Sequence, residues 1–157
     1  MQRPNWHQYF MKMAYLVSER STCLRRKVGA IVVRNNQVIS TGYNGAPKHL
    51  QHCRATGCLR KNMKIESGQR HELCRGVHAE QNAIIQAAVN GTSLKQAELY
   101  CTHQPCSICS KMIINAEIDQ IFIAETYPDK LAEQFLTEAG INVYLLKIDN
   151  GHPEKLF

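Results

Sequence analysis

Two short motifs supply residues that can bind a metal and move a proton. His78 and Glu80 stand two residues apart in the segment GVHAEQNAI (76–84). Cys106 and Cys109 form a C-x-x-C pair directly after Pro105. One imidazole and two thiolates are typical zinc ligands, and a site with three protein ligands leaves the fourth position open for a water molecule. The two motifs therefore predict a catalytic zinc site rather than a closed structural one.

Glu80 has an expected role beside such a metal. Zinc lowers the pKa of a bound water molecule to about 7. A carboxylate next to that water can take its proton and pass it to a ring nitrogen and then to a leaving amine. Singly, His78 would be typical of a helix start, the cysteine pair of a redox or structural site, and Glu80 of a first helical turn. Their order and their places before helices favour the catalytic interpretation.

Each motif lies at the start of a predicted helix, where unpaired N–H groups and the helix dipole lower the pKa of a thiol. The apolar periodicity predicts helices over 5–20, 79–89, 106–116 and 129–139. The β-branched runs predict strands over 28–33, 38–41, 97–103, 119–125 and 142–148. Strands separated by helices predict crossover connections and an α/β fold with a sheet covered on both faces.

The first and last of these helices each have a predicted apolar face. The face of the first helix consists of Trp6, Phe10, Met13 and Val17. The face of the last consists of Leu131, Phe135 and Ala139. An Asn35–Asn36 turn joins the first two predicted strands into a hairpin, because asparagine tolerates the positive φ of such turns.

The composition indicates one ordinary globular domain over residues 1–157. Hydrophobic residues make up 44% of the chain and charged residues 20%. No apolar run approaches the ~18 residues of a membrane span, and the first residues do not resemble a signal peptide, so we expect a cytoplasmic protein without a membrane partner. The formal net charge of +6 favours an anionic partner but does not choose between a nucleotide and a nucleic acid.

Residues 45–77 form a Cys/His-rich insert without apolar periodicity, which is long for a loop in a compact domain. The chain has seven cysteines, and in a reducing compartment such usage favours metal binding over disulfides. His71 and Cys74 have a spacing that suits one metal, whose binding could order the loop. The alternative is a set of thiols in a flexible loop.

Over nearly its whole length the chain resembles the cytidine and deoxycytidylate deaminase superfamily, and within it the deoxycytidylate (dCMP) deaminases. H-A-E and P-C-x-x-C form the signature of zinc deaminases that act on cytosine or adenine rings. The narrower resemblance rests on G-Y-N-G, the Cys-containing insert and E-T-Y. The segments that carry the resemblance are STCLRRKVGAIVV, STGYNGAP, HCRATGC, VHAEQNAI, THQPCSIC and AETY.

The resemblance implies a three-layer α/β/α cytidine-deaminase-like fold with a five-stranded mixed sheet. It implies zinc-dependent hydrolytic deamination of dCMP to dUMP and ammonia, supplying dUMP for thymidylate synthesis. His78, Cys106 and Cys109 are then the ligands of the catalytic Zn²⁺, and Glu80 is the proton shuttle. It also implies dCTP as an activator, dTTP as an inhibitor, a homo-oligomer that is usually a hexamer, and no nucleic-acid partner.

Three further positions are substrate contacts by resemblance. Asn44 matches a position that contacts the nucleotide, although a turn-forming asparagine is an alternative. Tyr127 matches a position that closes over the substrate, with an ordinary strand-end tyrosine as the alternative. Arg26, in the basic cluster 24–27, is expected near a phosphate, although a solvated face is an equal explanation for it.

The resemblance also implies a second, structural Zn²⁺. Cys23 and Cys53 match its family ligands best. His71 and Cys74 are the expected remaining ligands, and Cys58 is a rival for one of these places.

Two other functions remain open at this stage. A tRNA adenosine deaminase, or another nucleobase or nucleoside deaminase, shares the H-A-E and P-C-x-x-C motifs. It fits the Cys-rich insert and E-T-Y less well. A zinc-stabilised nucleic-acid-binding module is a different class of protein, in which the metal sites would be closed and Glu80 would have no task. Turnover separates the enzymes from the module.

Overall fold

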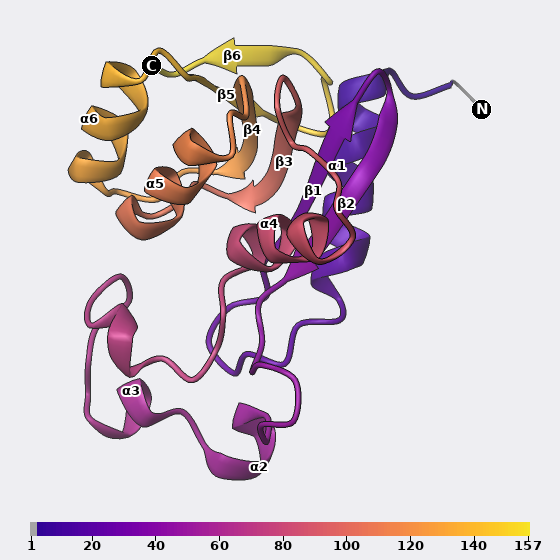
Figure 1. Ribbon diagram of the computed structural model, residues 1–157. Helices are drawn as coiled ribbons and strands as arrows, with labels where there is room; N and C mark the ends of the chain where they lie inside the picture. Colours follow the sequence, from indigo (N-terminus) through magenta and orange to yellow (C-terminus); the bar gives the residue numbers. More distant parts are fainter. Residues whose placement is uncertain (1–2) are drawn as a thin grey trace.

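A computed structural model describes residues 3–157 and contains one six-stranded mixed sheet (Figure 1). The strands are β1 (Gly29–Arg34), β2 (Gln37–Tyr43), β3 (Glu98–His103), β4 (Gln120–Glu125), β5 (Asn142–Leu146) and β6 (Pro153–Lys155). Their order across the sheet is β2-β1-β3-β4-β5-β6. β3, β4 and β5 run parallel, and the other neighbours pair antiparallel.

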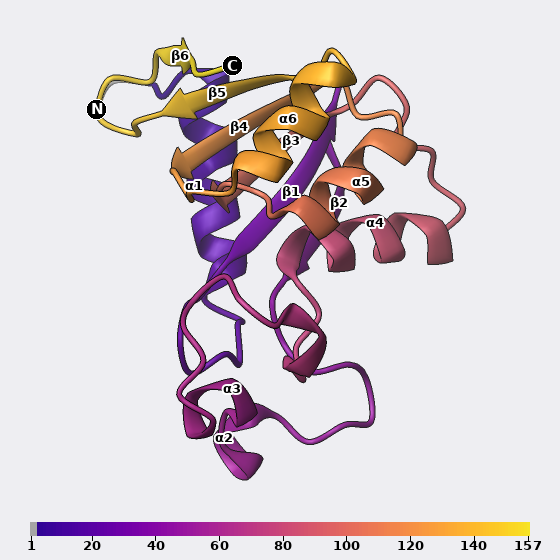
Figure 2. The same ribbon diagram turned by 90° about the vertical axis from the view of Figure 1, so that its left-hand side faces the viewer.

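Helices cover both faces of the sheet. α1 (Trp6–Ser18) packs on one face, and α4 (Ala79–Val89), α5 (Ser107–Asn115) and α6 (Lys130–Glu138) pack on the other (Figure 2). This arrangement confirms the predicted three-layer α/β/α fold. The predicted count of five strands is wrong, because β6 adds an antiparallel edge strand to β5. β6 has only three residues, which is too short for an alternating pattern to show in the sequence.

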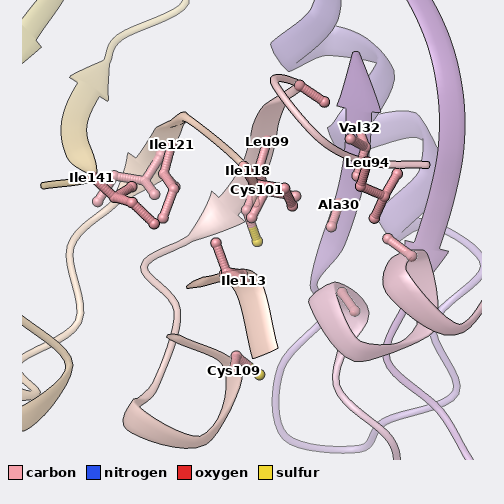
Figure 3. Packing of buried hydrophobic residues seen from close by; sticks show 14 of the residues in the cluster. Ala30, Val32, Leu94, Leu99, Cys101, Cys109, Ile113, Ile118, Ile121 and Ile141 are labelled. Atoms are coloured by element: carbon pink, nitrogen blue, oxygen red, sulfur yellow. The ribbon is translucent and has the colours of Figure 1, made fainter. Parts of the chain in front are cut away.

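Strand β1, which lies between β2 and β3, is buried on both faces and separates two apolar clusters. Ala30 and Val32 face α4 and α5, whereas Ile31 and Val33 face α1. This alternation follows from the period of two along a strand. Figure 3 shows the first cluster, in which Cys101 on β3 lies above the α5 residues Ile113 and Cys109. The core therefore fixes the position of α5, whose first turn carries the cysteine pair.

The predicted apolar face of the last helix is wrong, and that of the first helix is only partly correct. Phe10 is buried as predicted, and Met13 and Val17 pack against the core. α1 buries Phe10, Met11, Ala14 and Ser18, whereas Trp6 is 48% exposed. A Cβ at Gly29 would lie only 2.1 Å from the Ala14 carbonyl oxygen, so β1 approaches α1 where the helix has small side chains. Close approach of the backbones decides which stripe is buried, and apolarity alone does not reveal it.

On α6, too, the buried residues differ from those of the predicted apolar face. The helix buries Ala132 and Leu136, while Leu131 is 49% exposed. The predicted hairpin, in contrast, is confirmed. β1 and β2 pair antiparallel, and Asn35 and Asn36 between them have φ values of 52° and 59°.

The Cys/His-rich insert extends away from the sheet between β2 and α4 (Figure 1). An antiparallel bridge between Gly45 and Val77 closes it at its base, with N–H···O distances of 3.2 Å and 2.8 Å. The insert contains two short helices and one 3₁₀ turn, namely α2 (Cys53–Thr56), α3 (Leu59–Asn62) and η1 (His71–Leu73). Within residues 3–157, no helix is both long enough and apolar enough to cross a membrane.

Candidate active site

The N-termini of α4 and α5 bring His78, Cys106 and Cys109 together. His78 is the N-cap residue of α4, Cys106 is the N-cap residue of α5, and Cys109 lies in the first turn of α5. The Nδ1 atom of His78 is 3.3 Å from the Cys109 sulfur and 3.5 Å from the Cys106 sulfur. All three ligand atoms lie within 4.8 Å of one another, and no other such group occurs among residues 3–157.

Local hydrogen bonds hold the two helix starts in place. The backbone N–H of His78 donates to the Gln81 side-chain oxygen at 2.9 Å. Asp129 accepts from the backbone N–H of Ser107 at 2.8 Å and from that of Ala132 at 3.0 Å. One carboxylate therefore ties the first residue of α5 to the start of α6.

The close packing of α4 on β2 sets the position of His78. A Cβ at Gly42 would lie 2.2 Å from the Ala79 carbonyl oxygen and 2.4 Å from the Ala83 backbone nitrogen. Only a residue without a side chain permits this approach. The Ser40 hydroxyl also donates to the Ala83 carbonyl at 2.6 Å.

The donor set fits zinc. Zn–S and Zn–N bonds of about 2.3 Å and 2.0 Å at a tetrahedral angle place nitrogen and sulfur about 3.5 Å apart. The nitrogen–sulfur distances of 3.3 Å and 3.5 Å agree with this separation. Hydrogen bonding from Cys109, and then from His78, lowers the pKa of Cys106 to about 4 against the opposing effect of burial, which favours its thiolate form. A donor set of one nitrogen and two sulfur atoms is typical of Zn²⁺.

Glu80 lies in the first turn of α4, beside the three donor atoms, and is only 4% exposed. Burial raises the pKa of its carboxyl to about 7, against the opposing charge of His78. A carboxyl group that titrates near neutral pH can both accept and donate a proton under ordinary conditions. Glu80 is thus suited to proton transfer next to a metal.

A cavity opens in front of these residues and is walled on its other side by the insert. Tyr127 lines it, and the Arg26 guanidinium carbon lies 5.6 Å from the centre of the Tyr127 ring. The Tyr127 backbone N–H donates to Gln104 at 3.2 Å. The Tyr127 hydroxyl lies against Gly68 of the insert, where an added Cβ would be only 1.9 Å away. The structure therefore places Tyr127 and Arg26 together at the cavity.

Asn44 also lines the cavity, but its side chain is engaged within the chain. Its Oδ1 atom accepts from the Ser21 hydroxyl at 2.5 Å and from the Val28 N–H at 2.9 Å. Its Nδ2 atom donates to the Arg26 carbonyl at 2.8 Å. Asn44 thus holds the segment that leads into β1, and this agrees with the structural alternative as well as with a place at the cavity. Its contact with a nucleotide stays a prediction.

The expected ligands of the second zinc, Cys23, Cys53, His71 and Cys74 with Cys58 as the rival, all line the same cavity. Burial, and then the nearby thiols Cys58, Cys23 and Cys74, raise the pKa of Cys53. The His71 ring instead lies 5.0 Å from the His78 ring, and the first charge that acts on it is that of Cys106. These residues are less closely gathered than the His78 group, which is the one metal-type cluster within 3–157.

Three residues of the site were not predicted from the sequence. Gln104 lines the cavity and holds Tyr127, and Asp129 positions α5. Arg60, on α3, also lines the cavity although it lies in the insert. The place of Gln104 immediately before P-C-x-x-C is a signal that sequence analysis could have used. Asp129 and Arg60 reach the site through tertiary contacts, which leave no local pattern.

Comparison with known proteins agrees with this geometry. A family model described as the cytidine and deoxycytidylate deaminase zinc-binding region matches residues 4–125. The chain is 40% identical over 144 residues to the deoxycytidylate deaminase of Saccharomyces cerevisiae, covering 91% of this chain and 45% of that protein. It is 39% identical over 150 residues to the ComE operon protein 2 of Bacillus subtilis, covering 95% of this chain and 75% of that protein. This chain therefore spans less than half of the yeast relative.

A solved structure is similar over almost its full length. The dCMP deaminase of the cyanophage S-TIM5, in complex with dCMP and dUMP, superposes with a TM-score of 0.75 at 33% sequence identity. The alignment covers 91% of this chain and 98% of that one. Most of this chain therefore has a structural counterpart in a protein whose crystal structure contains dCMP and dUMP.

Proposed function

Because this chain belongs to the cytidine and deoxycytidylate deaminase family, we propose that it is a zinc-dependent enzyme that hydrolyses dCMP to dUMP and ammonia. The observation that carries the proposal is the group of His78, Cys106 and Cys109 with the buried Glu80 beside it. The cavity in front of the group is also lined by several arginines, which favours an anionic nucleotide.

His78, Cys106 and Cys109 would hold the Zn²⁺, and Glu80 would move the protons. When bound, zinc acts as a Lewis acid and lowers the pKa of a water molecule to about 7. Glu80 would take one proton from the attacking water and deliver it to N3 of the cytosine ring, while the water oxygen forms a bond to C4. It would then take the second proton from that oxygen and pass it to the amino group at C4, so that the C4–N bond breaks and ammonia leaves. A carboxyl pKa of about 7 suits both directions of transfer.

The remaining cavity residues would bind and enclose the nucleotide. Tyr127 would close over the substrate, since its ring lies between Arg26 and Gly68 of the insert. Arg26 would contribute positive charge at the open side of the cavity. Asn44 would act mainly by holding Arg26 and the start of β1, with a sugar hydroxyl as its expected contact.

A second, structural zinc in the insert is part of the proposal. Its ligands would be Cys23, Cys53, Cys74 and Cys58. Cys58 would thus take the place that the resemblance first assigned to His71. Like-charge repulsion among these thiols raises the pKa of Cys53 after the larger effect of burial. A cation among them would replace this repulsion with attraction and stabilise a segment that has little apolar core. His71 lies beside His78 and is free for another task.

Finer properties are proposed from the family resemblance. These are activation by dCTP, inhibition by dTTP, a homohexamer, a cytoplasmic location and a role in supplying dUMP for thymidylate synthesis. Their support is the G-Y-N-G segment at 42–45 and the family membership. Initial rates with and without dCTP or dTTP, and light scattering of the purified protein, test the regulation and the assembly.

A substrate panel tests the reaction itself. The zinc-loaded protein is incubated with dCMP, deoxycytidine, guanine and a tRNA stem-loop that contains adenosine, and released ammonia is measured for each. We expect kcat/KM to be highest for dCMP. Deamination of the stem-loop without deamination of dCMP would assign the chain to the tRNA adenosine deaminases instead. If ammonia is released from none of them, the zinc-stabilised binding module becomes the better account.

A further inference from the structure

Arg60 is a buried cation without an anionic partner in the wall of the cavity. Its side chain lies on α3 in the insert, and the residue is only 7% exposed. One guanidinium nitrogen donates to the Glu66 carbonyl oxygen at 3.2 Å, and its Nε–H group has no acceptor. Among residues 3–157, none of the ion pairs includes Arg60.

An arrangement of this kind needs an explanation, because a buried charge is costly unless it is paired and hydrogen-bonded. Metal binding does not supply the missing partner, since a guanidinium repels a cation and cannot act as its ligand. An anion does supply it. A planar guanidinium with free N–H donors suits the oxygens of a phosphate or carboxylate in particular.

Other polar atoms without a hydrogen-bond partner line the same cavity. The Nε2 atom of Gln104, a residue that is 5% exposed, has no partner, and neither has the buried Nδ1 atom of His71. Every buried side-chain polar atom without a partner within residues 3–157 belongs to Arg60, Gln104 or His71, and all three residues line this cavity. Such a concentration of unsatisfied polar atoms marks a place where a polar ligand completes the hydrogen bonding.

Arg60 and Glu80 line the same cavity, Arg60 from the insert and Glu80 from α4. A nucleotide with its base at Glu80 would therefore extend its other end toward the insert. Among the described residues that line the cavity, Glu80 is the only acidic one, and it transfers protons in the proposed reaction.

We propose that Arg60 binds the 5′-phosphomonoester of the pyrimidine nucleotide and so determines that the site takes a nucleotide rather than a nucleoside. This inference rests on the proposed function, since it places the base at Glu80. The insert then has a second task besides metal binding, because it carries the phosphate ligand to a site built by α4 and α5. The buried position of Arg60 strengthens the contact, because water screens it little.

Equilibrium binding of a product and its dephosphorylated form tests the proposal without requiring turnover. Calorimetry with the zinc-loaded protein compares dUMP with deoxyuridine for the wild type, Arg60→Gln and Arg60→Lys. Lys61→Gln is the matched control, because it removes a positive charge from an exposed position on the same helix. Zinc content and thermal unfolding verify that each variant is folded.

The wild type should bind dUMP much more tightly than deoxyuridine. Arg60→Gln should weaken dUMP binding about 100-fold and leave deoxyuridine binding within about threefold, as expected for removing a buried partner of a charge. Arg60→Lys should lie between the two, and Lys61→Gln should resemble the wild type. An equal loss for both ligands, or no loss for dUMP, would overturn the proposal.

The same experiment separates this inference from the proposed function. If the wild type binds dUMP in an Arg60-dependent way but does not deaminate dCMP, the phosphate assignment stands and the proposed reaction fails. If the wild type does not distinguish dUMP from deoxyuridine, the assignment fails whatever the reaction. Binding of an RNA stem-loop that depends on Arg60, with no binding of dUMP, would overturn the phosphomonoester and indicate a phosphodiester ligand.

Discussion

The Nδ1 atom of His78 lies 3.3 Å from the sulfur of Cys109, although 31 positions separate the two residues in the chain. The first belongs to the start of α4 and the second to the first turn of α5. These two helix starts meet because both helices pack on the same face of the sheet. The relationship predicts that a metal joins two elements that are otherwise held by apolar contacts.

Removing the Cys109 sulfur should therefore remove zinc from the catalytic site. Cys101 provides the matched control, because it is equally buried in the same apolar cluster but belongs to β3. Cys109→Ala should lose about one zinc per chain and nearly all activity, whereas Cys101→Ala should keep both. Metal analysis of the purified variants measures the difference. Equal zinc content in the two variants would contradict the ligand assignment.

The proposed second metal site predicts that variants at Cys58 and at His71 differ in their zinc content. Cys58→Ala should lose about one zinc per chain and lower the thermal midpoint, since a structural zinc contributes folding free energy. His71→Ala should retain its zinc, because the His71 ring lies beside the His78 ring, with 5.0 Å between the ring centres. Metal content and thermal unfolding of both variants decide between them. Loss of zinc in His71→Ala alone would restore His71 as the ligand.

The close contact between β2 and α4 predicts that one methyl group added at Gly42 lowers the stability of the protein. In Gly42→Ala the new Cβ would lie 2.2 Å and 2.4 Å from backbone atoms of α4, so the helix must move. We expect the free energy of unfolding to fall by about 1–3 kcal/mol. Activity should also fall because α4 carries His78 and Glu80. Gly76→Ala is the control, since its Cβ would meet nothing closer than 3.6 Å. Equal stability of the two variants in urea would refute the close packing.

His7 predicts a pH dependence of stability. Its ring packs on Phe122 and its Nδ1 atom is 2.9 Å from the Tyr100 hydroxyl. Burial lowers its pKa below the ordinary value near 6.5, against the opposing charge of Glu98. Below about pH 6.5 the unfolded chain thus binds this proton more readily than the folded chain, and stability falls as the pH falls. Above that pH the contribution of His7 is constant.

Denaturant unfolding between about pH 7.5 and pH 5 measures this contribution. His7→Phe should lose less stability across the interval than the wild type. The exposed His152 provides the control, and His152→Gln should follow the wild-type curve. Parallel curves for the wild type and His7→Phe would show that His7 does not carry the effect.

The sequence predicted the parts of this protein that depend on local patterns. β-Branched runs and helix periodicity revealed the strands and helices, and H-A-E and P-C-x-x-C revealed the residues that meet at the candidate metal site. Each of these motifs lies at a helix start, so its geometry is largely local. Hairpin formation at Asn35–Asn36 was predictable for the same reason.

The parts that could not be predicted depend on contacts between distant segments. The buried stripe of α1 is partly displaced because Gly29 permits close approach at Ala14. The position of the His71 ring beside the His78 ring depends on the path of the insert, which has no apolar pattern. Arg60 appears in the sequence as one of 19 basic residues, and only its burial in the structure distinguishes it.

The most direct test of the central claim is the product formed from dCMP in heavy-oxygen water, measured by mass spectrometry together with ammonia. The zinc-loaded wild type should form dUMP with one heavy oxygen in the base and release one ammonia for each. Glu80→Gln should keep its zinc and lower the rate by about 10³-fold, because the amide cannot accept the proton. Absence of labelled dUMP from the wild type, or full activity in Glu80→Gln, would contradict the assignment of this site to dCMP deamination.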